Sequence, residues 1–446
     1  MADINLKTVT ALSSRDTVVN VILEYDDGGT LKLGKATIGA VLAGLTSAAD
    51  HAALVARVAA LETAVGSGSG ETLPLFQVAN LSEASLPHES APNPKTDRTP
   101  FRLLRDVDGI AFAYQNDSVH FDGTIYGYEP FTVKPTLELA DGTLIPVTFK
   151  GARSVTIQTG EEVVSDIIPR RLLKGRYWHR ACLSSNGTRW PCSQGIGTAG
   201  AGAASFWGDA ADSHGASDFT VESLIFTPSA ILGTPLGSAG SRVLLLGDSI
   251  TAGFLESNHR VDAYGDMGGY GRGLSLAGIP HTKISVAGMR QTFPQTPSFL
   301  ELIKRVAKTN RSTHLFTNLS INSANYNLTE WKQQGMAMWD ALAQVGLPII
   351  QGTIGPWSNS TDNWATVENQ TATALAPQIA SYNAWMLAKP HSALMAVIDT
   401  NPAIEYSPGT SLWKPGTAFD ALHPNETGHA ALGLRVRDQI LALGLS

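Results

Sequence analysis

The pattern of hydrophobic positions changes near residue 237. After that point, four apolar runs have almost no polar interruption, which is typical of strands buried on both faces of a parallel sheet. These runs are 242–246, 314–319, 348–352 and 393–398. Apolar positions with helical spacing lie between and after them, at 298–307, 329–345, 374–388 and 426–443. Strands that alternate with helices predict a three-layer α/β domain over residues 238–446, with a parallel sheet at its centre.

Before residue 237 the apolar runs are shorter, and turn residues separate them. The runs 136–139 and 144–149 flank Asp141 and Gly142, which is a strong signal for a hairpin turn. Helical spacing is scarce between 101 and 237. We therefore expect residues 101–237 to form an accessory module built as a β-sandwich or jelly roll.

The N-terminal part predicts a small attachment unit followed by a linker. In residues 1–45, short apolar runs flank the turn signal at 26–29, so this segment is expected to be rich in β-structure. Residues 67–100 begin with alternating Gly and Ser and then contain five prolines, which is typical of a linker. The chain is therefore predicted to contain several domains.

A short coiled-coil-like helix is expected over 46–66. Its apolar positions are spaced by four, three and four residues: Leu54, Val58, Leu61 and Val65. Two heptads are too few for an isolated helix, so the segment needs copies of itself or a neighbouring surface. Self-association is favoured because a flexible tether follows directly. The alternative is an Ala-rich helix that packs on its own domain.

Composition and charge narrow the classes of function. Of the 446 residues, 43% are hydrophobic and 16% are charged, which is typical of a folded protein. The net charge of −7, without any run of Lys or Arg, argues against a nucleic-acid partner. No stretch reaches the roughly 18 apolar residues of a membrane span, so no membrane insertion is expected. The first residues lack the layout of a signal peptide, so an extracellular enzyme would leave the cell by another route.

The two cysteines, Cys182 and Cys192, allow two interpretations. They form one small disulfide loop in an oxidising setting, or they remain buried thiols. Neither interpretation makes them catalytic.

A candidate nucleophile follows the first buried run. Gly247, Asp248 and Ser249 come where that strand ends, and reactive groups of α/β sheets gather at this edge. At the start of the next helix, the backbone N–H of a serine is suited to stabilise an oxyanion. The alternative is that these small polar residues only cap the helix.

A second candidate precedes the last helix. Asp420 lies three residues before His423, so its carboxylate can fold back and hold the imidazole in the tautomer that accepts a proton. Asn425 follows at the position of a helix cap. Such a pair is common by chance, but together with Ser249 in an alternating α/β domain it favours a Ser-His-Asp triad.

Residues 240–446 resemble the SGNH (GDSL-type) hydrolase family, whose fold is a flavodoxin-like α/β sandwich. Its first block, Gly-Asp-Ser, is matched by Gly247, Asp248 and Ser249, and its last block by Asp420 and His423. The resemblance implies a serine esterase in which Ser249 is the nucleophile, His423 the general base and Asp420 its orienting group. It also implies that no metal and no organic cofactor is needed.

The two middle blocks of the family, which complete the oxyanion hole, fit less well. The resemblance places Gly288 in the second block, where its backbone N–H would act beside that of Ser249. In the third block Asn322 is retained, but Ser320 and Ser323 replace the family's Gly and Asp. Two nearby asparagines are rivals of Asn322: Asn318 and Asn325.

Several other residues near the predicted site have two interpretations each. Trp357 and Trp364 lie in a polar insertion and are candidates to stack on a sugar, or they anchor their loop to the body of the domain. Asp248 is a further candidate for substrate binding. His429 lies six residues after His423, which does not fit a metal-ligand pair, so a surface histidine is expected.

The order of the predicted parts resembles bacteriophage tail-fibre or spike proteins, which act on surface glycans from the virion. This implies that the chain forms a homotrimer, that residues 1–45 bind other virion proteins, and that the enzyme works extracellularly on its host. The resulting hypothesis is a carbohydrate O-acetylesterase that removes acetyl groups from bacterial surface polysaccharide. Two alternatives stay open: a non-catalytic glycan-binding receptor protein on the same fold, and a cellular GDSL lipase or esterase.

Overall fold

The computed structural model divides the chain into two compact units, Met1–Leu73 and Pro74–Ser446. The structure describes the second unit except for 83–85, 90–93, 121, 188, 195–203, 214, 216–217, 222–223, 255, 257–266 and 325–326. In the first unit it describes only four two-residue strands. There, β1 (Val18–Val19) pairs antiparallel with β4 (Ala36–Thr37), and β2 (Ile22–Leu23) with β3 (Lys32–Leu33). The predicted helix over 46–66 lies outside the described residues.

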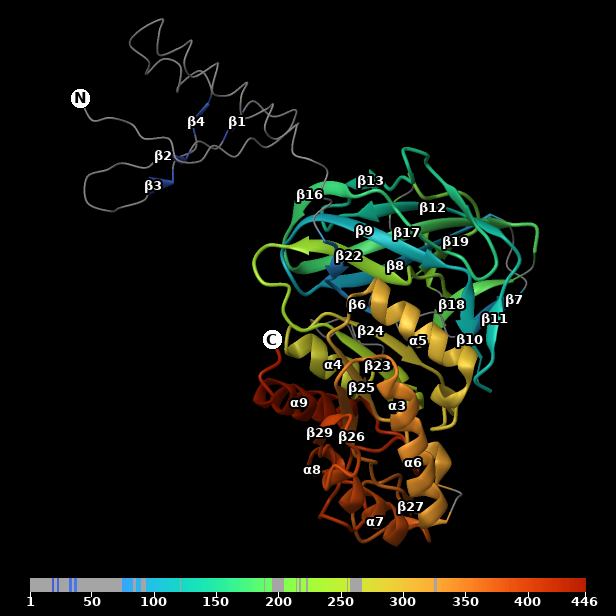
Figure 1. Cartoon of the computed structure of the whole chain (residues 1–446), viewed down its shortest axis with the longest axis vertical. Coiled ribbons are helices and arrows are strands. Elements are labelled where there is room, and N and C mark those ends of the chain that lie inside the picture. The colour runs from blue at the N-terminus through green and yellow to red at the C-terminus, as the bar shows by residue number, and fades with distance from the viewer. Residues whose placement is uncertain are drawn as a thin grey trace, which may run out of the picture. The chain divides into compact units, whose positions relative to one another are not determined.

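Two antiparallel sheets build the first part of the second unit (Figure 1). One has the order β13-β12-β17-β8-β19-β20, with β14 also paired to β12; the other has the order β15-β9-β22-β5, with β16 also paired to β9. One apolar cluster contains side chains of both sheets, among them Phe131 and Phe112, so the sheets enclose a common core. The strands are β5 (Phe76–Gln77), β8 (Lys95–Leu103), β9 (Val107–Gln115), β12 (Phe131–Glu138), β13 (Leu144–Pro146), β14 (Val155–Ile157), β15 (Glu162–Val164), β16 (Ile168–Leu172), β17 (Gly175–Ser185), β19 (Ala204–Phe206), β20 (Thr220–Val221) and β22 (Ala230–Pro235).

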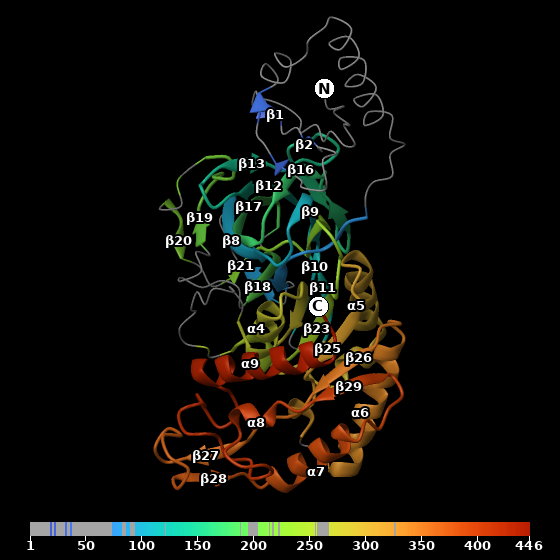
Figure 2. The same cartoon turned by 90° about the vertical axis from the view of Figure 1, so that its left-hand side faces the viewer.

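Two smaller pieces of sheet complete this part. A three-stranded sheet has the order β21-β18-β7, with β7 (Leu86–Glu89), β18 (Arg189–Gln194) and β21 (Leu224–Ile225). A separate hairpin consists of β10 (Asp117–Val119) and β11 (Ile125–Gly127). In both views this hairpin lies beside helix α5 (Figures 1 and 2).

The parallel sheet predicted for the C-terminal part is present. Its order is β29-β26-β25-β23-β24-β6, and each of these neighbouring pairs is parallel. Its strands are β6 (Asn80–Ser82), β23 (Val243–Gly247), β24 (His281–Ser285), β25 (His314–Thr317), β26 (Ile349–Gly352) and β29 (Leu394–Ile398). The helices are α3 (Ser249–Ala252), α4 (Gly269–Leu276), η3 (Phe293–Gln295), α5 (Pro297–Thr309), η4 (Ile321–Ser323), α6 (Leu328–Ala343), α7 (Ala376–Leu387), α8 (Asn401–Ile404) and α9 (Glu426–Ala442).

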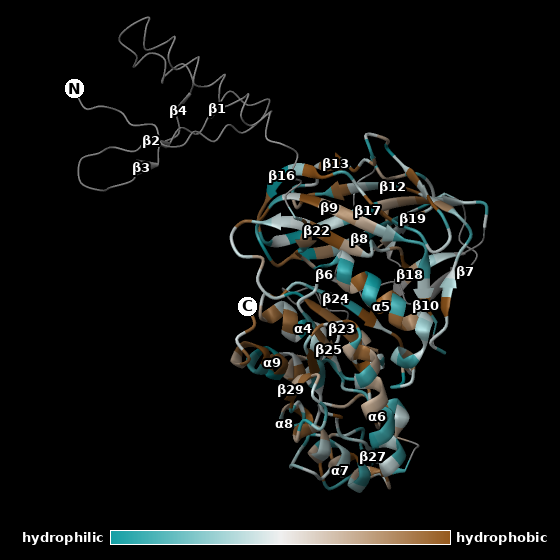
Figure 3. Ribbon diagram, in the orientation of Figure 1, coloured by the Kyte–Doolittle hydropathy of each residue, from teal (hydrophilic) through white to brown (hydrophobic). Residues whose placement is uncertain are grey.

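Helices cover both faces of the parallel sheet. Leu244 and Leu246 belong to one apolar cluster with side chains of α5, α6 and α7, whereas Val243 and Leu245 belong to another with α4 and α9. Successive residues of a strand point to opposite faces, so a strand covered on both sides must be apolar throughout. Accordingly, the central strands are hydrophobic, while α5 and α6 carry hydrophilic residues (Figure 3).

Residues 74–100, expected to be part of a linker, contain β5, β6, β7 and the start of β8. The first three strands have only two, three and four residues, which is too short for a sequence pattern to reveal. Their partners are also distant in sequence: β6 forms the edge of the parallel sheet beside β24, and His281 N–H donates to Ala79 O over 3.1 Å. Strand β6 thus joins the parallel sheet between β5 and β8, which both belong to the sandwich formed by the two antiparallel sheets.

Two glycines allow α4 and α9 to pack closely. A Cβ on Gly269 would lie 2.4 Å from Leu432 Cβ, and one on Gly273 would lie 2.6 Å from Val436 Cβ. At the start of α4, the Gly269 N–H donates to His429 Nδ1 over 3.0 Å. His429 is fully buried, and burial lowers its pKa to about 3. The expectation of a surface histidine is therefore wrong, because α9 turns this residue toward the glycine-rich helix.

The cysteines lie in neighbouring parts of the sandwich, Cys182 in β17 and Cys192 in β18. Both are buried and neither forms a disulfide, and burial raises the pKa of Cys182 to about 11. Such a thiol stays protonated and unreactive near neutral pH. Among the described residues, no helix is long and apolar enough to cross a membrane.

Candidate active site

The turn after β23 places Ser249 at the edge of the parallel sheet. Ser249 is the first residue of α3, and Asp248 caps this helix by accepting the Ile250 N–H over 3.0 Å. Gly247 is required here because a Cβ would lie 2.1 Å from Thr251 Oγ1. The strand and the tight turn together fix the position of the serine side chain.

His423 joins the serine to a carboxylate. Its Nε2 lies 2.9 Å from Ser249 Oγ, and its Nδ1 lies 2.9 and 3.0 Å from the two carboxylate oxygens of Asp420. The Phe254 ring meets the imidazole edge to face, with ring centroids 5.5 Å apart. The structure therefore brings the three residues of the predicted triad into one hydrogen-bonded chain.

A local turn fixes Asp420. Its Oδ1 accepts the backbone N–H groups of Leu422 and His423 over 2.8 and 2.7 Å. Burial acts to raise the pKa of Asp420, but these N–H groups and the His423 ring outweigh it, so the pKa lies below its usual value. Asp420 is therefore ionised at neutral pH and holds a proton on His423 Nδ1, which leaves Nε2 free to accept one from the serine.

Asp248, predicted as a possible substrate contact, has a structural place instead. It is fully buried, and besides capping α3 it accepts a hydrogen bond from Asn318 Nδ2 over 3.1 Å. Burial raises its pKa, while the bonds from Asn318 and Ile250 oppose that effect. A side chain without solvent exposure cannot reach a substrate in this arrangement, so Asp248 organises the turn that carries Ser249.

The two predicted oxyanion donors lie next to each other. Gly288 occupies an exposed turn after β24 with φ of +80°, a conformation that favours glycine. Asn322 lies in η4, and its Nδ2 donates to the carbonyl oxygen of Met289 over 3.1 Å. An amide NH₂ group carries two hydrogens, so one remains to donate to a substrate.

Of the two rivals of Asn322, Asn318 is buried and holds the turn that carries Ser249. It accepts a hydrogen bond from Thr251 Oγ1 over 2.7 Å and donates to Asp248, and it is buried. Both of its contacts support the serine turn. Asn325 lies outside the described residues.

Gln291 explains the departures in the third block, and sequence reasoning missed it. This fully buried side chain donates to Ser320 Oγ over 3.3 Å and to Tyr382 Oη over 2.7 Å, and its backbone N–H donates to Ser323 Oγ. The two serines therefore bind the segment that follows β24. No local motif identifies such a glutamine, because all its partners are distant in sequence.

Trp357 and Trp364 belong to the insertion that contains the hairpin of β27 (Ser358–Ser360) and β28 (Gln370–Ala372). Both are partly buried and pack against the apolar clusters beside the sheet. Trp364 Nε1 donates to Ser358 O over 3.2 Å. These contacts fit the interpretation that the tryptophans anchor the loop.

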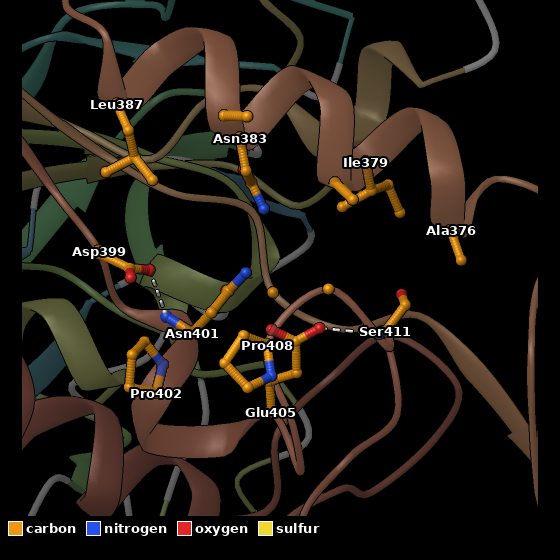
Figure 4. A pocket seen from close by; sticks show the side chains of 14 residues that line it. Ala376, Ile379, Asn383, Leu387, Asp399, Asn401, Pro402, Glu405, Pro408 and Ser411 are labelled. Atoms are coloured by element: carbon orange, nitrogen blue, oxygen red, sulfur yellow. Dashed lines mark hydrogen bonds between the residues drawn. The ribbon is translucent and has the colours of Figure 1, made fainter.

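A cavity of about 200 Å³ lies between α7 and the loop after β29 (Figure 4). Its carboxylates are engaged: Asp399 accepts the Asn401 N–H over 3.3 Å, and Glu405 accepts the Ser411 N–H over 2.7 Å. Of the described residues that line it, none belongs to the triad. Nor do the described residues include a group of His, Cys, Asp and Glu side chains suited to hold a metal ion.

No family model and no curated protein matches the sequence. Among solved structures, the chain is similar to a GDSL-like lipase from Bacteroides thetaiotaomicron, with 13% identity, 45% of this chain and 88% of the other covered, and a TM-score of 0.32. It is similar to a carbohydrate esterase family 2 enzyme with a carbohydrate binding domain from Corynascus thermopiles, at 13% identity, with coverage of 83% and 99% and a TM-score of 0.32. A family two carbohydrate esterase from Cellvibrio japonicus is 11% identical, with coverage of 83% and 94% and a TM-score of 0.34.

Proposed function

We propose that this protein hydrolyses carboxylic esters, with Ser249 as the nucleophile. The observation that carries the proposal is the continuous hydrogen-bonded chain from Ser249 Oγ through His423 to Asp420. A nucleophile, a base within hydrogen-bond distance and a group that orients the base are the parts that acyl transfer requires. Helix capping alone does not account for this arrangement, because Asp248 already caps α3.

In the proposed mechanism, His423 Nε2 takes the proton of Ser249 as Oγ attacks the ester carbonyl carbon. The negative charge that develops on the carbonyl oxygen is stabilised by the N–H groups of Ser249 and Gly288 and by the amide of Asn322. The imidazolium then gives its proton to the leaving alcohol oxygen, and an acyl-enzyme forms. Water then attacks the acyl carbon while His423 takes one of its protons. The bond between the acyl carbon and Ser249 Oγ breaks, His423 returns the proton to Oγ, and the carboxylic acid is released.

The proposed substrate is an O-acetylated bacterial surface polysaccharide, attacked from a virion. The support is the predicted order of the chain, in which a β-rich unit, a short coiled-coil-like helix and a tether precede the catalytic part. Residues 1–45 would bind other virion proteins, and the helix over 46–66 would join three copies of the chain.

Hydrolysis of p-nitrophenyl acetate by the wild type and by Ser249→Ala tests the catalytic proposal. We expect turnover by the wild type and a loss of about 10⁴-fold or more in the variant. If neither protein turns over the ester or releases acetate from host polysaccharide, the esterase proposal fails and a glycan-binding protein becomes the better explanation. A strong preference for long acyl chains would instead favour a lipase.

Analytical ultracentrifugation of the full chain tests the proposed assembly. A trimer is expected for the whole protein, and a variant that lacks residues 1–73 is expected to sediment as a monomer. A full-length protein that remains monomeric at high concentration would contradict the trimer.

A further inference from the structure

The hairpin β10–β11 belongs to the sandwich part of the chain but packs into the core beside the parallel sheet. Val119, at the end of β10, is fully buried in the same apolar cluster as Val286, Met289 and Phe293. Ile125, at the start of β11, packs against that cluster as well. Both strands of the hairpin therefore contact the cluster to which the segment 286–295 belongs, and this segment carries Gly288.

The turn of the hairpin lies directly against Phe293. Gly123 has φ of +85°, and a Cβ on this residue would lie 2.9 Å from Cγ of the Phe293 ring. Cγ is the atom through which the ring is attached, so it cannot give way as the end of a flexible side chain would. Glycine is required here both for the backbone conformation and for the close contact.

An ion pair fixes the base of the same hairpin. Arg305, on α5, binds Asp117 of β10 with N–O distances of 2.6 and 2.8 Å, and the Asp117 side chain is almost fully buried. Helix α5 begins two residues after the segment 286–295. The hairpin is therefore held to the structure that follows the segment as well as to the segment itself.

The segment has a second set of contacts with η4. Asn322 donates to Met289 O, and Ser323 accepts the Gln291 N–H. The position of Gly288 thus depends on contacts within the α/β part, among them those with η4 and with Tyr382 of α7, and on the hairpin, which a different sheet provides.

We infer that the β10–β11 hairpin is a positioning element of the active site, which holds the 286–295 segment so that the Gly288 N–H points at the developing oxyanion. Gly123, Val119 and Phe293 are its positioning residues. The inference rests on the proposed function. It implies that the sandwich is required for the chemical step and is more than an appended binding module.

The chain contains a matched control for the hairpin turn. At 120–124, Gly123 N–H donates to His120 O, His120 N–H to Thr124 O, and Thr124 N–H to Asp122 Oδ1, each over 2.9 Å. The turn at 139–143 repeats this pattern with Asp141, Gly142 and Thr143 over 2.9 to 3.0 Å. Gly142 has φ of +83°, but a Cβ there would meet nothing within 4 Å. Gly123→Ala and Gly142→Ala therefore introduce the same backbone strain, and only the first disturbs Phe293.

The test measures kcat and KM for p-nitrophenyl acetate together with amide hydrogen exchange of the 286–295 segment. We expect Gly123→Ala to lower kcat by about tenfold or more with KM changed less than twofold, because an oxyanion donor acts mainly in the transition state. Exchange in the segment should become faster. Gly142→Ala should keep wild-type values in both measurements.

Equal kcat and equal exchange in the two alanine variants would overturn the inference. If the wild type has no esterase activity, the proposed function fails, and amide exchange then tests the hairpin alone. Faster exchange of the 286–295 segment in Gly123→Ala but not in Gly142→Ala would still support the contact between hairpin and segment. Equal exchange in the two variants would overturn it. Should Gly123→Ala fail to fold, Val119→Ala replaces it, with Val133→Ala as control. Both valines are fully buried, but Val133 lies in the core of the sandwich.

Discussion

The two halves of the candidate site are held in place in different ways. In the nucleophile half, His423 binds both Ser249 and Asp420 directly, with distances of 2.9 to 3.0 Å. In the oxyanion half, Gly288 lies in a turn and Asn322 in η4, and hydrogen bonds to Met289 and Gln291 hold the two segments together. The first half is thus specified by a short turn between an Asp and a His, whereas the second depends on contacts between distant parts of the chain.

The largest effect is expected in the nucleophile half. His423→Ala should lower kcat/KM for p-nitrophenyl acetate by about 10⁴-fold or more, because Ser249 loses its only base. The Ser249→Ala and His423→Ala double variant should be no worse than either single variant, since the residues act as a unit. Additive losses would contradict this.

A second His-Asp pair serves as the control for that prediction. His391 Nε2 lies 3.1 Å from Asp340 Oδ1, but this pair joins the loop before β29 to α6. His391→Ala should therefore retain the wild-type kcat/KM within about twofold. A large loss in this variant would indicate that general destabilisation, and not missing chemistry, explains the effect at His423.

The oxyanion half should give a smaller loss of activity. Asn322→Ala is expected to lower kcat by about 100-fold, with little change in KM, because one of three donors to the oxyanion is lost. The melting temperature should change little, since Asn322 is partly exposed and gives up one hydrogen bond. An unchanged kcat would remove Asn322 from the oxyanion hole.

Asn318 distinguishes a donor to the substrate from a structural amide. Asn318→Ala should lower the free energy of unfolding by about 1–3 kcal/mol, because Asp248 and Thr251 lose a partner in a buried place. Denaturant unfolding measures this effect, and kcat of the folded variant should fall less than in Asn322→Ala. If Asn318→Ala instead loses kcat without losing stability, the roles of the two asparagines are reversed.

The same contrast explains which parts of the site could be predicted from sequence. The triad is identifiable because each half of it is local: Ser249 follows a buried strand by two residues, and Asp420 lies three residues before His423. The roles of Gln291 and Gly123 beside the site have no such local signal. Their partners lie tens to about 170 residues away, and only the packed structure brings Gly123 against Phe293.

The fold also has parts that local sequence patterns predict and parts that depend on distant contacts. The long apolar runs of β23 and β29 predict the parallel sheet because strands covered on both faces must be apolar throughout. Strand β6 contributes to the same sheet, but its three residues carry no periodicity, so residues 67–100 are predicted to be a linker. The burial of His429 also depends on a tertiary contact, since Gly269 allows α9 to come close.

The smallest expected effects come from two carboxylates whose pKa values shift in opposite directions. Asp420, in the nucleophile half, has a lowered pKa, so it stabilises the fold above about pH 4, and this contribution is lost as pH falls through its folded pKa. The contribution is no more than about 1 kcal/mol, because the side chain is 40% exposed and water screens it. Asp420→Asn should therefore be less stable than the wild type at pH 7, and the difference should disappear as pH falls through the folded pKa of Asp420.

Glu162, on β15, lies where the sandwich meets α5, and its Oε1 accepts a hydrogen bond from Thr309 over 2.7 Å. Burial raises its pKa and Asp117 adds to this, while Thr309 and Arg305 oppose it. Stability linked to Glu162 is therefore present below about pH 4 and is lost as pH rises through the raised pKa. Glu162→Gln keeps an acceptor for Thr309 without the charge, so it should be more stable than the wild type at pH 7, by about 1 kcal/mol. Melting temperatures measured from pH 3 to 8 test both predictions. At neutral pH, the melting temperature should be below the wild-type value for Asp420→Asn and above it for Glu162→Gln. Shifts of the same sign would contradict the opposite pKa shifts of the two carboxylates.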